Sequence, residues 1–324
     1  MRLAYVRLDK AIQRMHNVTS RSYHGGKMLE NIHDEKIEEK SQVFHVSTGG
    51  IIHAKTVCRV GMEGATALFI HGGGSGGNHS MLTRAARYLV AQGIFSRVIL
   101  PDRRGSGKSS ALERSMTFSD NAADMQALLD AMGVHGCITA MGISYGGPIA
   151  LTLAAIDPRA NRVILVASSA SLRSAKGLKG FLYRTNLLKP IIAAVYGKLV
   201  GSLPPSIADF DPIYDASSPT ELKAIFMDAI KSTPKERLES LLLENASTLD
   251  LRNQSIPENL IISVPVLKVI GELDEIWQVE EDASIAVRIP HLKTVIIQKA
   301  RHQDCFFRAD EFYRAICVEM QGIS

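Results

Sequence analysis

Short apolar runs alternate with amphipathic patterns along most of the chain. The runs TALFIHGGG, SRVILPD, GCITAMG and NRVILVAS predict strands, and MLTRAARYLVAQ, DNAADMQALLDAMGV and GPIALTLAAI, which stand between them, predict helices. Ser119 or Asp120 is the expected cap of the second helix, and Pro148 lies in the first turn of the third. Because the predicted strands are apolar on both faces, this alternation indicates a parallel sheet between two layers of helices.

The pattern changes at both ends of this alternating region. SQVFHVSTGGIIHAKTVC predicts a hairpin that turns at Gly49 and Gly50. After Leu172 helical patterns follow one another without a strand, until VPVLKVIGELDE and KTVIIQKARHQD restore strands and DCFFRADEFYRAICVEM predicts one amphipathic helix. We therefore expect an N-terminal extension over 1–40, an α/β core over 41–171 and 258–324, and a helical cap over 172–257.

Composition excludes several classes of protein. The chain has 324 residues, 46% hydrophobic and 22% charged, enough for a large core, and a mixed net charge of +4 that does not favour nucleic acid. The apolar stretch 187–201 is short and contains Lys189 and Lys198, so no stable membrane span is expected. The cysteines are neither dense nor in CxxC pairs, which predicts reduced thiols in a cytoplasmic protein: Cys58, Cys137, Cys305 and Cys317.

The first forty residues allow two interpretations. They are rich in arginine and poor in acids, with apolar residues loosely at helical spacing, as in a mitochondrial-type presequence. A peripheral helix or a frayed extension is the favoured alternative.

One pentapeptide carries the chemistry. Gly142-Ile143-Ser144-Tyr145-Gly146 follows a predicted strand and opens a predicted helix, the context expected of a G-x-S-x-G nucleophile elbow. Glycines leave room for the neighbouring backbone in such a sharp turn, and the helix that starts there directs amides at developing negative charge. We predict that Ser144 is a nucleophile.

A serine nucleophile needs a base, and the base needs an orienting acid. Asp274 follows a strand that ends at Gly271, where Glu272 and Glu275 are rival candidates, and solvation of a turn is the alternative role for these acids. Of ten histidines, only His302 follows the last predicted strand. We predict Asp274 and His302 as partners of the serine, and the other histidines, His53 among them, as surface or packing residues.

The segment LFIHGGGSGGNHS ends a strand in glycines, whose bare amides can approach a substrate oxygen. The amides of Gly73 and Tyr145 are the predicted oxyanion hole. His71 is expected to order this loop by hydrogen bonds rather than to transfer protons.

The segment DRRGSGKSS contains Gly107-Lys108-Ser109, the last residues of a phosphate-binding P-loop. That motif requires glycine at position 102, where this chain has Asp102, and no helix follows promptly. We interpret the segment as a tight surface turn stabilised by Asp102 and Arg104.

Together these motifs resemble the α/β-hydrolase superfamily, from about Gln42 to the C-terminus. The resemblance rests on HGGG (71–74), DRRGSGKS (102–109), GISYGG (142–147), GELD (271–274) and RH (301–302), in the order of that family. It implies an α/β-hydrolase fold, a mostly parallel sheet flanked by helices with a helical cap, and a Ser-His-Asp triad. DRRGSGKS is most similar to the turn of prolyl iminopeptidase-like hydrolases, but Gly74 and Arg301 differ from the proline and glycine usual there.

The expected function is a serine hydrolase that cleaves an ester or amide bond of a small substrate through an acyl-enzyme, with esterase-like specificity. A proline-type aminopeptidase would need cap carboxylates such as Glu239 and Glu244 to bind a peptide amino terminus; solvated helix charges are the favoured interpretation of both. A non-catalytic binder on the same fold is the third class. No metal or organic cofactor is required by this chemistry, and the oligomeric state is left open.

Overall fold

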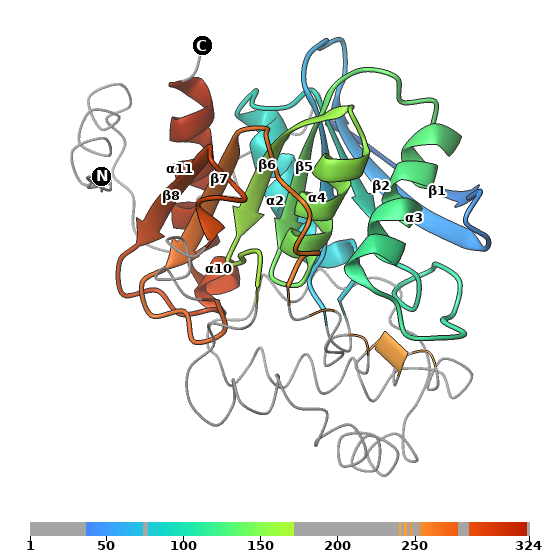
Figure 1. The fold of residues 1–324 in the computed structure, drawn as a ribbon. Coiled ribbons are helices and arrows are strands. Elements are labelled where there is room, and N and C mark those ends of the chain that lie inside the picture. Colours follow the sequence, from blue (N-terminus) through green and yellow to red (C-terminus); the bar gives the residue numbers. More distant parts are fainter. Residues whose placement is uncertain are drawn as a thin grey trace, which may run out of the picture.

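The computed structural model describes residues 37–73, 77–171, 240, 243–244, 247, 253, 255–277 and 285–322. They contain an eight-stranded sheet in the order β1-β2-β4-β3-β5-β6-β7-β8 (Figure 1). Strands β1, β2 and β4 pair antiparallel, and all remaining pairs are parallel. The strands are β1 (Ile37–His45), β2 (Ile51–Arg59), β3 (Thr66–Ile70), β4 (Arg97–Pro101), β5 (Ile138–Ile143), β6 (Ala160–Val166), β7 (Val266–Gly271) and β8 (Leu292–Ile297).

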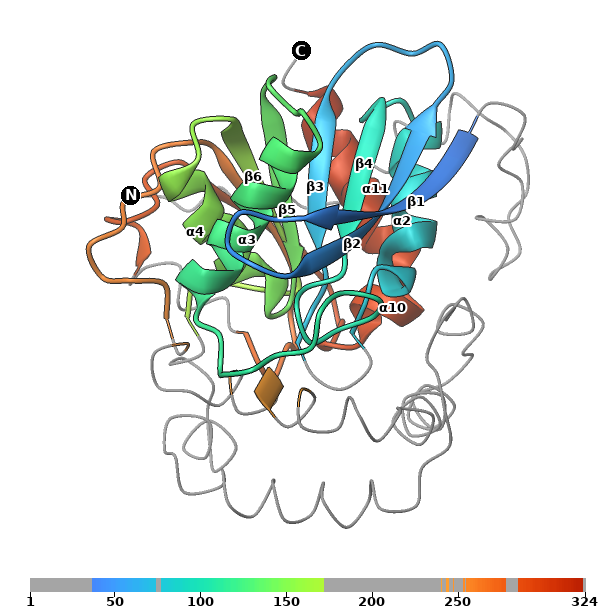
Figure 2. The same cartoon turned by 90° about the vertical axis from the view of Figure 1, so that its right-hand side faces the viewer.

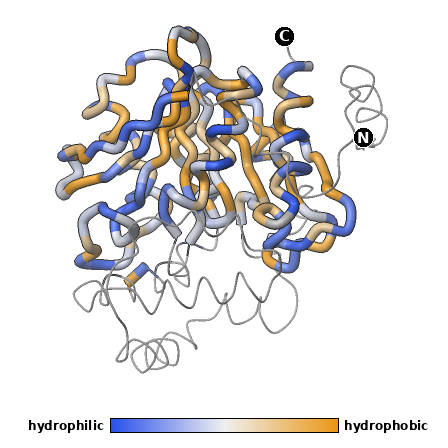
Figure 3. Tube along the Cα trace, turned by 180° about the vertical axis from the view of Figure 1, so that it is seen from behind, coloured by the Kyte–Doolittle hydropathy of each residue, from blue (hydrophilic) through white to orange (hydrophobic). Residues whose placement is uncertain are grey.

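Helices cover both faces of the sheet, as the apolar strands require. Helices α3 (Phe118–Ala131) and α4 (Gly146–Ile156) pack on one face, and α2 (Ser80–Ala91) and α11 (Ala309–Gln321) on the other (Figure 2). Each face has its own hydrophobic cluster, with Phe118 and Ile149 in one and Leu82 and Phe312 in the other. In the described part of the chain, hydrophobic residues accordingly gather along the central strands (Figure 3).

The predicted strands and helices are confirmed, with differences at their ends. Strand β1 begins at Ile37, inside the segment assigned to the N-terminal extension. Helix α3 is capped by Thr117, not by Ser119 or Asp120, because the Thr117 side chain accepts from the amide of Asp120 while Asp120 accepts from the amide of Thr117. The predicted C-terminal helix is two helices, α10 (Asp304–Phe307) and α11, because the backbone of Arg308 leaves the helical region.

The predicted cap, 172–257, and the extension before Ile37 lie almost wholly outside the described residues. The two ends of the cap segment are neighbours, since Ser171 and Ser255 form an isolated antiparallel bridge and the amide of Ile256 donates to the carbonyl of Ala170.

None of the four cysteines, all of which are described, is in a disulfide. Within the described part of the chain, no helix has the length and apolar character needed to cross a bilayer.

The parallel strands end at one edge of the sheet, and every predicted site residue follows a strand end there. His71 to Gly73 follow β3, Ser144 follows β5, Asp274 follows β7 and His302 follows β8. Parallel strands bring such residues together because their carboxyl ends share an edge.

Candidate active site

Ser144 occupies a sharp turn between β5 and α4. Its φ of +49° is in the left-handed region, which is unusual for a residue other than glycine and is a recurrent feature of functional sites. Its backbone is held on both sides, since its amide donates to the carbonyl of Val166 (3.0 Å) and its carbonyl accepts from the hydroxyl of Ser168 (2.5 Å). The strained residue is therefore fixed by the strand beside it.

The glycines around Ser144 are required by close packing. A Cβ on Gly142 would lie 2.2 Å from the carbonyl oxygen of Gly146, and one on Gly146 would lie 2.3 Å from the carbonyl oxygen of Ile70. A Cβ on Gly147 would lie 2.0 Å from the Oγ of Ser168. The pattern seen in the sequence is thus a consequence of backbone passing close to backbone.

Ser144, His302 and Asp274 form one chain of hydrogen bonds. Ser144 Oγ lies 3.1 Å from His302 Nε2, and His302 Nδ1 lies 2.9 Å from Asp274 Oδ2. The other oxygen of Asp274 accepts from the amides of Ile276 and Trp277, at 2.9 Å each. Both His302 and Asp274 are buried, so the carboxylate is held in place and directed at the imidazole.

The two rival carboxylates lie elsewhere. Glu272 accepts from the backbone amide of Lys299 at 2.8 Å, and Glu275 lies 3.4 Å from the amide of His302. Only Asp274 reaches the histidine ring in the described structure. Of the three acids of this loop, the structure brings the predicted one to His302.

The loop after β3 lies beside the serine. A Cβ on Gly72 would come within 3.4 Å of the Cβ of Ser144. Gly73 is the next residue, and Tyr145, directly after Ser144, is the N-cap residue of α4, so both predicted amide donors belong to segments that border the hydroxyl.

His71 orders this loop, as expected. Its Nδ1 lies 2.8 Å from the carbonyl oxygen of Gly72, and its Nε2 accepts from the amide of Arg103 at 3.0 Å. Burial, together with the nearby Arg103 charge, lowers the pKa of His71 to about 3. The ring is neutral, with a proton on Nδ1, because the amide of Arg103 occupies the other nitrogen.

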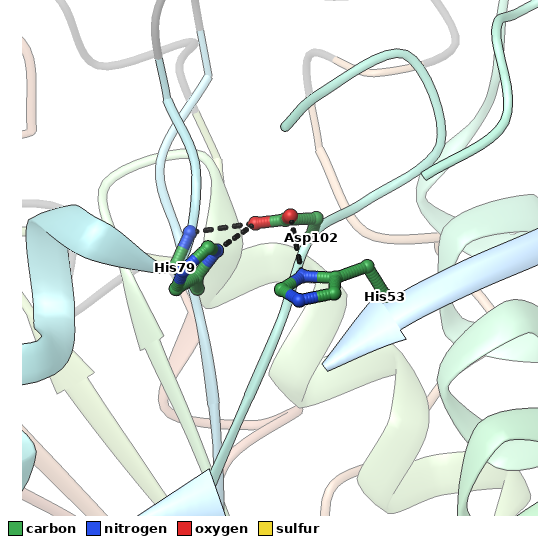
Figure 4. A group of neighbouring side chains, drawn as sticks. All are labelled: His53, His79 and Asp102. Carbon is green, nitrogen blue, oxygen red and sulfur yellow. Dashed lines mark hydrogen bonds and ion pairs between the residues drawn. The ribbon is translucent and has the colours of Figure 1, made fainter. Parts of the chain in front are cut away.

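The segment 102–110 is not the surface turn that the sequence suggested. Asp102 is fully buried and accepts from the ring of His53 (2.9 Å) and from the ring and amide of His79 (2.7 and 2.8 Å) (Figure 4). It also accepts from the amide of Lys108 (2.9 Å). Burial acts to raise the pKa of Asp102, but the hydrogen bonds from His53 and His79 outweigh it and hold that pKa well below its usual range. Arg104 pairs with Asp124, so the two predicted anchors of the turn do anchor it.

His53, His79 and Asp102 were not foreseen as a group, since they come from three separated segments. Imidazole and carboxylate are also ligands of zinc, and these three groups lie close enough together to hold an ion. A metal would have to replace the two imidazole–carboxylate hydrogen bonds, which already account for the cluster. We interpret it as the structural tie that joins β2, α2 and the loop after β4.

Glu244 is not a solvated helix charge. Its side chain is 2% exposed, and its Oε1 lies 2.5 Å from a terminal nitrogen of Arg103, which is 3% exposed. Burial raises the pKa of Glu244 to about 7, although Arg103 acts in the other direction. The second candidate cap acid, Glu239, lies outside the described residues.

A strained serine between a strand and a helix, joined to a buried histidine and carboxylate at the carboxyl edge of a mostly parallel sheet, defines an α/β-hydrolase. The chain belongs to the alpha/beta hydrolase fold family, whose profile matches residues 67–309. It is therefore an enzyme of the hydrolase class.

Three relatives of known name are a lipase, a methyl ester esterase and an iminopeptidase. The chain is 28% identical to Lipase 1 of Psychrobacter immobilis, over 77% of this chain and 75% of that protein. It is 28% identical to the pimeloyl-[acyl-carrier protein] methyl ester esterase of Vibrio atlanticus (53% and 66% covered) and 24% identical to the proline iminopeptidase of Thermoplasma volcanium (84% and 94%).

Solved structures agree on the fold. An esterase from Exiguobacterium antarcticum superposes with a TM-score of 0.65 at 18% identity, covering 87% of this chain and all of that one. A thermophilic esterase from Thermogutta terrifontis gives 0.61 at 20% identity, covering 88% and 99%.

Proposed function

We propose that the protein hydrolyses carboxylic esters of small acyl substrates through a covalent acyl-enzyme. The observation that carries this proposal is the continuous hydrogen-bond chain from Ser144 through His302 to Asp274. His302 takes the proton of Ser144 as the oxygen attacks the ester carbonyl, and Asp274 stabilises the imidazolium that forms. His302 then protonates the leaving alcohol, and water, activated by the same histidine, hydrolyses the acyl-enzyme.

The amides of Gly73 and Tyr145 are the proposed donors to the tetrahedral oxyanion. Donors of this kind are each worth about 3 kcal/mol of transition-state stabilisation. Gly73 follows a residue that borders the serine, and Tyr145 is the N-cap of a helix whose dipole favours negative charge at that end.

Ester hydrolysis is favoured over aminopeptidase activity by the state of Glu244. A carboxylate that binds a substrate ammonium must be open to it, and this one is buried against the guanidinium of Arg103. The lipase and methyl ester esterase among the relatives support an ester as substrate, while the iminopeptidase supports the alternative.

Covalent labelling tests the proposal. We expect a fluorophosphonate probe to label the wild-type protein and to leave Ser144→Ala unlabelled, with Ser115→Ala, at a serine of the loop before α3, as the matched control. p-Nitrophenyl esters of graded acyl length, set against proline p-nitroanilide, then separate esterase from peptidase. A wild-type protein that takes no label, or that cleaves only the anilide, contradicts the proposal.

A further inference from the structure

We propose that Arg103 is a positioning residue for the oxyanion hole, and that Glu244, from the segment predicted as the cap, holds Arg103 in that role. The inference rests on the proposed function, because it concerns how the two donor amides are oriented. In the described structure no contact joins Arg103 to the Ser144 hydroxyl or to the His302 ring; it acts through the carbonyl of Gly72 and the ring of Tyr145.

The first contact fixes a peptide plane. A terminal nitrogen of Arg103 donates to the carbonyl oxygen of Gly72 at 2.9 Å, and the Nδ1 of His71 donates to the same oxygen at 2.8 Å. That carbonyl shares its peptide plane with the amide of Gly73, and in a trans peptide the C=O and N–H point in opposite directions. Two donors on the carbonyl thus set the direction of the Gly73 N–H, in a loop that borders Ser144.

The second contact reaches the other donor residue. The guanidinium carbon of Arg103 lies 5.0 Å from the centre of the Tyr145 ring, within the range of a cation–π interaction. The same ring also packs against Phe118, with centroids 5.0 Å apart. A single guanidinium therefore contacts the carbonyl of Gly72, which belongs to the same peptide as the Gly73 amide, and the side chain of Tyr145, the other proposed donor residue.

Glu244 is the buried acidic partner of the Arg103 guanidinium. An unpaired buried charge is costly, and removing one partner of a buried pair leaves the other uncompensated. Glu244 lies 141 positions further along the chain, and its segment is tied to the core beside it, because Ser240 accepts from the amide of Leu112 and Ser247 from the amide of Met116. Packing of this segment against the core is thereby linked to the orientation of the donors.

Arg104 provides a matched control. It is the next residue, it is partly buried, and it donates two hydrogen bonds to the buried carboxylate of Asp124 at 2.6 and 2.7 Å. No described contact joins it to Gly72 or Tyr145. Arg104→Met therefore removes an arginine and an ion pair from this loop, while Arg103→Met also removes the contacts that orient the oxyanion hole. Comparing the two variants separates these effects.

The experiment uses the full chain with p-nitrophenyl butyrate, with rates divided by the number of sites titrated by a fluorophosphonate. For Arg103→Met we expect kcat to fall about 10- to 100-fold with KM changed less than about 3-fold, a smaller loss than removal of a whole donor. Affinity for a trifluoromethyl ketone, which forms a tetrahedral oxyanion on the serine, should fall by a similar factor. Arg103→Lys should recover part of both, and Arg104→Met should keep kcat per titrated site within about 3-fold of wild type.

The role of Glu244 is tested by coupling. Glu244→Gln should lower kcat in the wild-type protein but have no further effect in Arg103→Met, because it acts through Arg103. If Arg103→Met yields no folded protein, Arg103→Lys replaces it, and a smaller kcat loss at constant KM is expected.

The outcomes are distinguishable from those of the proposed function. An active, labelled wild type whose Arg103 variants keep kcat and ketone affinity, or lose only the fraction of titratable sites, overturns this inference alone. A wild type that neither hydrolyses the ester nor takes the label overturns both.

Discussion

His71 and Glu244 both lie against Arg103, and burial moves their pKa values in opposite directions. Burial lowers the pKa of His71 from 6.5 to about 3, and burial raises the pKa of Glu244 from 4.5 to about 7. A histidine whose pKa is lowered by folding makes the protein less stable as the pH falls, because the unfolded chain then binds a proton that the folded chain does not. A carboxyl group whose pKa is raised by folding makes the protein more stable as the pH falls, because protonation removes the cost of burying the carboxylate.

The magnitudes follow from these pKa values. Between pH 7 and pH 5 the unfolded His71 becomes protonated while the folded one does not, which costs about 2 kcal/mol of unfolding free energy. Over the same interval folded Glu244 becomes protonated while the unfolded residue stays mostly ionised, which contributes about 2 kcal/mol in the other direction. The two contributions nearly cancel in the wild-type protein, so each is visible only when the other is removed.

Between pH 7 and pH 5, we expect the unfolding free energy of His71→Asn to rise by about 2 kcal/mol relative to wild type. That of Glu244→Gln should fall by about as much over the same interval. Urea unfolding at the two pH values, followed by the fluorescence of the buried, single Trp277, measures both. Ser115→Ala, at a half-buried side chain that does not titrate, is the control and should run parallel to wild type. If all three variants keep the wild-type pH dependence, neither buried group titrates as described.

Three further outcomes are expected. Gly147→Ala should destabilise the fold by about 1–3 kcal/mol, because its Cβ would lie 2.0 Å from the Oγ of Ser168. Ser168→Gly in the same chain should restore part of the loss, and thermal or urea unfolding that shows no coupling between the two substitutions contradicts this packing. Thr117→Ala should cost about 1 kcal/mol by removing the capping box with Asp120, and an unchanged urea midpoint would refute it. Asp274→Asn should leave the fold intact but lower kcat about 10⁴-fold, because an amide that donates to the imidazole favours the wrong tautomer; near-wild-type ester hydrolysis would remove Asp274 from the mechanism.

Local sequence was sufficient wherever the determining contacts lie within one element or one turn. The doubly apolar strands are readable because each central strand is buried on both faces, and the elbow at Ser144 is readable because its glycines meet backbone only a few positions away or on the neighbouring strand. Asp274 and His302 could be found because each lies in the loop that follows a predicted strand, β7 and β8 respectively. The cap of α3 was misplaced by two residues or more, because Thr117, Ser119 and Asp120 are all good cap residues and only the backbone decides between them.

Tertiary structure decided the contacts between distant segments. Nothing in the local pattern distinguishes Glu244 from a solvated helix charge; burial against Arg103, 141 positions away, makes the difference. The same holds for Asp102, whose charge is stabilised by His53 and His79 from two other elements. A periodic pattern shows which face of an element is apolar. Whether a charged side chain can be buried depends on the partner that the folded chain brings to it. That partner is determined only when the strand ends meet at one edge of the sheet.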